Sequence, residues 1–438
     1  MKPILMTAFF VLVLGPVVCC GDLIVPGGNA IHPTASVAVE KLLDADNTVG
    51  AQRELEAIAL ENPDLPHPKL MLAQIIFQRG DVNRGRSILE RLSVEEPERF
   101  DVRVAFCSLA VDQQRWFDGW VHAQAASELE MPSGWSAERR VSAQLELALL
   151  KGDCCAGRSD WEAAEQIYAN ACVVGQSSAL YRQLLSRLAR AKFQLDKIRD
   201  CYQTLLTLQS TQVNHSPAEI VLAEWFASQG NQKRAERWFE ESVTSHPQFA
   251  PVSYARWLLD TNDAKKAEGV LQGFHTDDAS DSEENETVIA ELNLLLAMAM
   301  RMQGRFVEAQ QILSPLHQAD PTNFGTSNQL ALVLIESAEE SQRARALQIA
   351  EVCVRTHRGA ADAWATLGWI QFRTGDLEQA QQSLAIATRS GHVSRDTAYF
   401  LAELGTALGR KDQATKFRKA AQLAEGPFFY SRNGLPQR

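Results

Sequence analysis

Long hydrophobic runs are scarce in this sequence. After residues 4–18, no apolar stretch approaches the roughly 20 residues that a membrane-spanning helix needs. Apolar residues nevertheless make up 45% of the 438 residues, while glycine and proline are modest at 25 and 16. This composition argues against an intrinsically disordered chain and against an integral membrane protein. A folded, soluble chain is therefore expected.

Basic residues are also in short supply. The chain carries 43 basic against 54 acidic side chains, which makes its formal net charge -11. Such a chain repels phosphate backbones and anionic lipid headgroups unless its basic residues are gathered in a patch, and the sequence holds no basic cluster of useful length. We therefore predict no nucleic-acid partner.

The motifs of common catalytic and metal sites are absent as well. The sequence contains no glycine-rich phosphate loop, no Gly-x-Ser-x-Gly elbow, no His-Glu-x-x-His pair and no Cys-x-x-Cys pair. Without these patterns there is no nucleophile beside a base and no set of ligands for zinc. We predict no catalytic residue, no metal site and no cofactor.

What the sequence does contain is a unit of about 34 residues that recurs along nearly the whole chain. The clearest copy covers residues 361–387, and its marker residues are Trp364, Leu367, Gly368, Gly375, Asp376, Ala380, Leu384 and Ala387. Other copies cover residues 66–97, 216–247 and 290–321. Small residues at two places let antiparallel helices approach closely, and apolar residues spaced by three or four form the buried stripe of each helix.

This unit resembles a tetratricopeptide repeat, in which a Leu-Gly pair, a Gly-Asp turn and a later Ala, Leu and Ala stand at these places. The resemblance implies an all-α fold, an α-solenoid wound as a right-handed superhelix of about eleven antiparallel helical hairpins. One hairpin buries too little surface to be stable alone, so the stability comes from stacking neighbours into one continuous core.

The spacing of the repeats also predicts the domain organisation. Residues 34–274 form an N-terminal array that is irregular over 132–208, where an insert at residues 152–159 is expected to form a turn. Residues 275–286 are rich in Asp and Glu, and we interpret them as a solvated linker. The C-terminal array covers residues 287–427, and residues 428–438 are interpreted as a tail.

The first 20 residues differ from all that follow. Lys2 precedes an apolar run over residues 4–18, and small residues come next, which is the outline of a secretory signal. Residues 21–33 then read as a flexible tether. The residues before Cys20 resemble a bacterial lipoprotein signal, so lipidation of Cys20 and plain cleavage near Gly21 are the two alternatives. Either way the chain is exported and is periplasmic or membrane-attached, and it meets the membrane only through a lipid anchor or an uncleaved signal.

The cysteines leave two alternatives open. Cys154 and Cys155 are neighbours in the predicted insert, and either could pair with Cys172 or Cys201 if the hairpins bring them close. The other alternative is that most cysteines are unpaired and act as small apolar residues.

The resemblance also implies where a partner binds. In this fold the first helix of each pair lines a concave groove, and the same places in this sequence give nine candidates for partner binding. They are Phe77, Leu294, Met298, Leu332, Ile335, Trp369, Phe372, Arg373 and Tyr399; Arg301 occupies a further groove position. The C-terminal repeats together form an apolar and aromatic strip that suits an extended peptide or an amphipathic helix. The alternative is that these side chains pack against the next repeat as core.

The predicted function is a non-catalytic scaffold or adaptor, exported, that binds a peptide or helix of a protein partner in the concave groove. A structural accessory subunit of an envelope secretion, pilus or polysaccharide-export complex is the alternative. A third hypothesis is an enzyme whose unrecognised site lies in the irregular residues 132–208.

Overall fold

The computed structural model describes residues 33–211, 216–248, 250–273, 283–389, 391, 393–424 and 426–430. These residues contain 22 helices and no strand, which confirms the predicted all-α fold. The predicted signal at residues 1–20 with Cys20, nearly all of the tether at 21–33 and most of the acidic linker at 275–286 lie outside the described residues.

The chain divides into two compact units, with the boundary between Val221 and Leu222. This boundary differs from the predicted linker at residues 275–286, because α13 and α14 pack against α15 and so join the helices before the linker to those after it. Residues 283–286 begin α15. We call residues 33–221 the N-terminal unit and residues 222–430 the C-terminal unit; α11 crosses the boundary.

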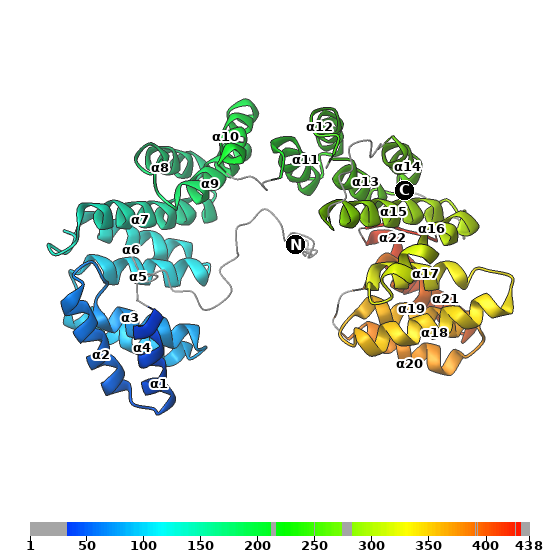
Figure 1. Ribbon diagram of the computed structural model, residues 1–438, viewed down its shortest axis with the longest axis horizontal. Helices are drawn as coiled ribbons and strands as arrows, with labels where there is room; N and C mark the ends of the chain where they lie inside the picture. The colour runs from blue at the N-terminus through cyan, green and yellow to red at the C-terminus, as the bar shows by residue number, and fades with distance from the viewer. Residues whose placement is uncertain are drawn as a thin grey trace. The chain divides into compact units, whose positions relative to one another are not determined.

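In the N-terminal unit the helices follow one another as antiparallel neighbours (Figure 1). They are α1 (Pro33–Asp44), α2 (Thr48–Glu61), α3 (Pro68–Gln78), α4 (Val82–Glu95), α5 (Phe100–Asp112), α6 (Trp116–Glu128), α7 (Ala137–Gly157), α8 (Trp161–Val174), α9 (Tyr181–Gln194) and α10 (Ile198–Ser210).

The C-terminal unit follows the same plan. Its helices are α11 (Ala218–Ser228), α12 (Gln232–Ser245), α13 (Ala250–Asp260), α14 (Ala264–Gln272), α15 (Glu283–Met302), α16 (Phe306–Ala319), α17 (Phe324–Leu334), α18 (Glu340–Thr356), α19 (Ala361–Arg373), α20 (Leu377–Ala387), α21 (Arg395–Ala407) and α22 (Lys411–Leu423).

One type of turn joins the two helices of most hairpins. A residue with positive φ ends the first helix, and these residues are Asp46, Gly80, Gln114, Ser159, Asp196, Gly230, Asn262, Gly304, Gly375 and Gly409. This left-handed conformation stops a helix, and glycine adopts it at little cost. From 46 to 80, from 80 to 114, from 196 to 230 and from 375 to 409 the spacing is 34 residues. The sequence repeat is therefore a repeat of backbone conformation.

The next residue in six of these turns starts the second helix. Asn47, Asp81, Asp160, Asn231, Asp263 and Asp376 each accept a hydrogen bond from the backbone N–H three residues later. Such N-caps are worth about 1 kcal/mol each. The Gly-Asp signal in the sequence thus reflects two requirements, a left-handed residue and then a cap.

The two helices of a hairpin cross closely at small residues, and Gly368 shows how tight the contact is. A Cβ at this position would lie 2.7 Å from Leu384 Cγ, 3.1 Å from Leu384 N and 3.2 Å from Ala380 O. Because two of these atoms belong to the backbone of α20, the hairpin would have to open to accept a methyl group.

We expect Gly368→Ala to lower the free energy of unfolding by about 1–3 kcal/mol, as overpacking does. The matched control is Gly269→Ala in α14, where a Cβ would have no atom within 4 Å. That change should raise stability by about 0.5–1 kcal/mol, since alanine favours a helix over glycine. Urea unfolding followed by circular dichroism measures both, and two changes of the same sign and size would contradict the close crossing.

The predicted insert at residues 152–159 is wrong in one respect. Instead of an inserted turn, α7 continues to Gly157, so Cys154 and Cys155 lie in a helix. The glycines there allow rings to pack on the helix: a Cβ at Gly152 would lie 2.3 Å from Tyr168 Cε1, and one at Gly157 would lie 2.2 Å from Trp116 Cδ2. A longer helix, rather than a longer loop, accounts for the break in the spacing.

The six cysteines in the described part of the chain have free thiols and are all buried. Neither predicted pairing, of Cys154 or Cys155 with Cys172 or Cys201, is formed. Cys154 contacts Cys107 instead. Their thiols share a hydrogen bond between α7 and α5, and that bond, together with burial, raises the pKa of Cys107. The cysteines therefore act as small core residues in this structure.

Candidate functional site

First helices of successive hairpins contact one another in the C-terminal unit. The pairs are α13 with α15, α15 with α17, α17 with α19 and α19 with α21. We call the surface that these five helices form the first-helix face. It carries eight of the nine residues that the sequence predicts for partner binding, all but Phe77.

An aromatic cluster lies on this face, with Trp369 of α19 at its centre. The Trp369 ring centroid is 4.5 Å from that of Phe400, 5.3 Å from that of Phe372 and 5.7 Å from that of Tyr399. Only 3% of Trp369 is exposed. The cluster joins α19 to α21 by stacking and edge contacts, which add stabilisation beyond the area that they bury.

A buried cation lies beside the cluster. Arg301 of α15 is 2% exposed and forms an ion pair with Asp396 of α21 at 3.4 Å. Its Nη1 donates to Gln329 Oε1 at 2.7 Å, and its Nη2 donates to the Tyr430 hydroxyl at 3.2 Å. A buried guanidinium is costly unless its hydrogen bonds are satisfied. Arg301 therefore holds three separate parts of the unit together.

The end of the described chain covers this face. Residues 426–430 follow α22 without forming a helix, and Phe428 and Tyr430 are 4% and 5% exposed. The Tyr430 ring is 5.0 Å from that of Tyr399 and 5.3 Å from that of Trp369, and Arg301 lies 4.1 Å above the Phe429 ring. Residues 428–430, which the sequence assigned to a tail, are thus packed into the C-terminal unit.

The backbone of this segment is held by side chains from both ends of the unit. Phe428 N–H donates to Asn262 Oδ1 at 2.8 Å, and Phe429 N–H donates to Asp396 Oδ1 at 3.2 Å. Arg395 donates to the carbonyl oxygens of Ala421 and Gly426, both at 3.1 Å. Asn262 is 166 residues from Phe428 in sequence, so only the fold brings these groups together.

Most of the predicted partner-binding residues are buried in the structure. Leu332, Ile335, Trp369 and Tyr399 are at most 5% exposed and belong to one core cluster of the C-terminal unit. Phe77 is 4% exposed and lies in the N-terminal unit, where it packs on Gly85 between α3 and α4. These five side chains serve as core, and their role in binding a partner stays a prediction.

The other four candidates are more accessible. Leu294, Met298 and Phe372 are half-buried, and the Arg373 side chain is 34% exposed. Arg373 forms an ion pair with Glu336 at 2.7 Å and lies 5.4 Å above the Trp369 ring. Leu294, Met298 and Phe372 therefore mark the more accessible part of the first-helix face.

Sequence reasoning missed the role of the segment itself and of Asp396. One signal was available: Phe428, Phe429 and Tyr430 are three consecutive aromatic residues in a stretch interpreted as tail, and aromatic residues are usually at least partly buried. Asp396 gave no signal, because its partner Arg301 lies 95 residues away in the sequence.

Burial changes the pKa of Asp396, whose side chain is 16% exposed. Desolvation raises the pKa of Asp396 from its ordinary value of 3.8 to about 6, and Asp362 of α19 acts in the same direction. Arg301 and the Phe429 N–H act against the rise. Burial likewise raises the pKa of the neighbouring Tyr430 hydroxyl. The folded unit therefore binds a proton at Asp396 more tightly than the unfolded chain does.

A raised carboxyl pKa makes stability fall as the pH rises from the unfolded value to the folded one. Relative to Asp396→Asn, the wild type should lose about 3 kcal/mol of unfolding free energy between about pH 4 and about pH 7. Urea unfolding of both chains across this range measures the difference, and other titrating groups cancel in it. A difference that does not change with pH would show that Asp396 is solvated.

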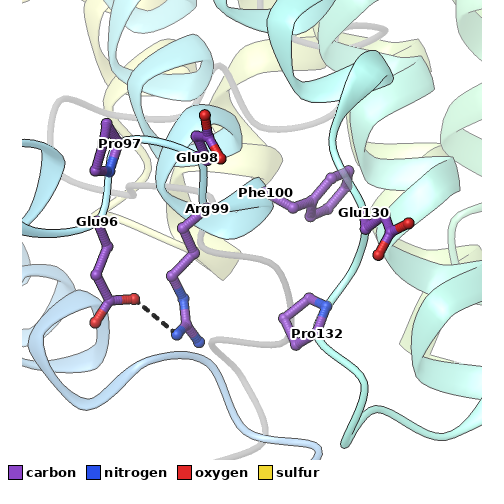
Figure 2. A pocket seen from close by; sticks show the side chains of 7 residues that line it. All are labelled: Glu96, Pro97, Glu98, Arg99, Phe100, Glu130 and Pro132. Atoms are coloured by element: carbon purple, nitrogen blue, oxygen red, sulfur yellow. Dashed lines mark hydrogen bonds and ion pairs between the residues drawn. The ribbon is translucent and has the colours of Figure 1, made fainter.

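A pocket of about 370 Å³ lies in the N-terminal unit (Figure 2). It is lined by Glu96, Pro97, Glu98, Arg99, Phe100, Glu130 and Pro132. Arg99 is held by Glu96 at 2.9 Å and by Asp101 at 2.7 Å. The lining residues include three carboxylates and one guanidinium, with no hydroxyl, thiol or imidazole. The pocket therefore lacks a hydroxyl or thiol paired with an imidazole base.

No group of three or more His, Cys, Asp or Glu side chains in the described ranges is placed to hold a metal ion. None of the described helices is both long enough and apolar enough to span a bilayer.

Three features together decide the fold. They are the left-handed turns, four of whose intervals are 34 residues, the Asx caps and the close small-residue crossings. It is the fold of a tetratricopeptide repeat protein. The superhelical hand and the number of hairpins stay predictions. No protein-family model matches the sequence, and no curated protein matches it either.

Solved structures similar to this chain include a tetratricopeptide repeat protein from Parabacteroides merdae, at 16% identity and a TM-score of 0.40, over 60% of this chain and 99% of that one. Pseudomonas aeruginosa pilF matches at 17% identity and a TM-score of 0.33, over 47% of this chain and 89% of that one. A chain of the APC/C Cut9–Hcn1 hetero-tetramer matches at 13% identity and a TM-score of 0.35, over 90% of this chain and 80% of that one.

Proposed function

We propose that this protein is a non-catalytic scaffold that binds a protein partner through a peptide segment on the first-helix face of the C-terminal unit. The observation that carries the proposal is residues 426–430, a non-helical segment that this face already holds. Side-chain oxygens of Asn262 and Asp396 accept hydrogen bonds from its backbone N–H groups, and its aromatic side chains pack against aromatic rings of the face. Backbone hydrogen bonds combined with aromatic anchors are a general means of peptide recognition.

The chemistry of the pocket supports the non-catalytic part of the proposal. Its guanidinium is already paired with carboxylates, and its walls carry no hydroxyl, thiol or imidazole. A repeat array has a large surface for its mass, and such a surface serves recognition.

A photo-crosslinking side chain placed at single positions tests the proposal. Positions Met298 and Phe372 are half-buried on first helices, while Val352 is 43% exposed on the second helix α18 and serves as the matched control. We expect adducts at 298 and 372 that map to one continuous segment of a single partner, with none at 352. Equal adducts at all three positions, or none on the first helices, would contradict the proposal.

We further propose that the chain acts outside the cytoplasm. The apolar run at residues 4–18 with small residues at 19–21 supports export, and Cys20 is the candidate for lipidation. Metabolic labelling with a clickable fatty acid tests this directly. Label on the wild type that is lost in Cys20→Ala supports lipidation, whereas an unlabelled chain that starts near Gly21 supports plain cleavage. A chain that keeps residues 1–20 and stays in the cytoplasm would contradict export.

A further inference from the structure

Residues 426–430, with the sequence Gly-Pro-Phe-Phe-Tyr, occupy the first-helix face as a bound peptide would. Phe428 lies 4.9 Å below the Arg395 guanidinium and 6.0 Å from the Tyr399 ring. Phe429 lies 4.1 Å below Arg301, and the hydroxyl of Tyr430 accepts from Arg301 at 3.2 Å. Each aromatic residue of the segment therefore meets a cation, and two of them also meet rings of the cluster.

The face recognises both the backbone and the side chains of this segment. Two consecutive N–H groups, those of Phe428 and Phe429, donate to side-chain oxygens of Asn262 and Asp396. Such contacts depend on a non-helical backbone with free N–H groups, whereas an α-helix would use most of its own N–H groups internally. The face thus suits an irregular or extended peptide with adjacent aromatic residues.

We propose that residues 426–430 are an internal ligand of the first-helix face, and that the partner takes their place with a non-helical segment of its own that carries adjacent aromatic residues. This inference rests on the proposed function and names the chemistry of the partner. The partner segment would place two neighbouring rings against Arg395 and Arg301, and a hydrogen-bond acceptor where the Tyr430 hydroxyl meets Arg301.

The way the segment is attached allows such an exchange. It forms no helix, and it follows α22, which ends at Leu423. A tethered segment competes at an effective concentration in the millimolar range, so even modest contacts keep the face occupied until a stronger ligand arrives.

One donor at the face is also left unused by the internal segment. The Trp369 Nε1 is buried and has no acceptor among the described residues, although the Trp369 ring lies 5.3 Å from that of Tyr430. A buried donor without an acceptor is costly. A partner segment that supplied an acceptor there would bind more tightly than residues 426–430 and could displace them.

A fluorescent synthetic peptide, Glu-Gly-Pro-Phe-Phe-Tyr-Ser, tests the exchange on the full chain. Its sequence is that of residues 425–431. Fluorescence anisotropy compares its binding to the wild type and to the triple variant Phe428→Ala, Phe429→Ala, Tyr430→Ala, whose internal segment has lost its anchors. We expect binding to the variant to be at least about 10-fold tighter, because the tethered competitor is gone.

Two controls keep the experiment decisive. Tyr430→Phe removes only the hydroxyl that meets Arg301, so it should give a smaller gain of about 3-fold in a chain whose core is intact. Leu423→Ala changes an exposed residue just before the segment and should bind the peptide like the wild type. A peptide with all three aromatic residues replaced by alanine should bind none of the chains.

The outcomes separate this inference from the proposed function. If the peptide bound neither the triple variant nor Tyr430→Phe, residues 426–430 would be a permanent cap on the face. If it bound the wild type and both variants equally, these residues would not block the peptide's binding site. Either result overturns the inference, while position-specific adducts at Met298 and Phe372 would still uphold the proposed function. Tighter peptide binding to both variants than to the wild type, with the larger gain in the triple variant, supports the inference that residues 426–430 are an internal ligand.

Discussion

Replacing Trp369 by alanine is expected to lower the free energy of unfolding of the C-terminal unit by about 3–5 kcal/mol, the usual loss when a large aromatic core residue is truncated. The reason is the place of this side chain at the centre of its cluster. Trp369 is 3% exposed, and its ring lies within 5.3 Å of the rings of Phe372, Phe400 and Tyr430. Its removal would leave a cavity between α19, α21 and residues 426–430.

Urea unfolding followed by circular dichroism measures this loss. The matched control is Trp364→Ala, which removes the same side chain from the same helix at a half-buried position where Nε1 donates to Arg358 O at 3.1 Å. The control should lose clearly less stability, because the exposed part of its ring gains nothing from burial. If both variants lost the same amount, the cluster would not be a packed core.

Replacing Arg301 by methionine is expected to cost about 3–5 kcal/mol as well, for a different reason. Arg301 is 2% exposed and pairs with Asp396 at 3.4 Å. Methionine fills much of the same space but leaves Asp396 in a buried site without its cation. An uncompensated buried charge accounts for most of such a loss, so the second change Asp396→Asn should recover a large part of it.

The single and double variants are compared by urea unfolding at neutral pH, where Asp396 is ionised in the wild type. The matched control is Arg418→Met, because Arg418 is 40% exposed and its partner Glu403, at 3.3 Å in the same unit, is 31% exposed. A loss below about 1 kcal/mol is expected there. A double variant no more stable than Arg301→Met would show that shape, and not charge, explains the effect.

The hairpin turns could be predicted from the sequence because their cause is local. Gly80, Gly230 and Gly375 stand where the backbone needs a positive φ, and the Asx residue after each one caps the next helix. Where Gln114 or Ser159 takes the left-handed position, the same turn forms without the glycine signal, so the repeat was harder to see. Residues 132–208 depart from the repeat spacing because Ser159 and Asp196 take this position there and because α7 is longer than its neighbours.

The candidate site was predicted only in part. Spacing placed Trp369, Phe372 and Tyr399 on first helices, and the structure brings these three rings together. Spacing alone could not tell that Leu332, Ile335, Trp369 and Tyr399 would be buried, because burial depends on the helices and segments that pack over them. The same residue pattern fits an open groove and a filled one.

The sequence by itself determined the repeating hairpin, since helix periodicity, the left-handed glycine and the Asx cap act within a few residues. Only the tertiary structure decided what covers the first-helix face. It brings Phe428 to Asn262 over 166 residues and Arg301 to Asp396 over 95. Such contacts depend on how the whole unit stacks, and the short-range pattern of a sequence carries no record of a pairing over that distance.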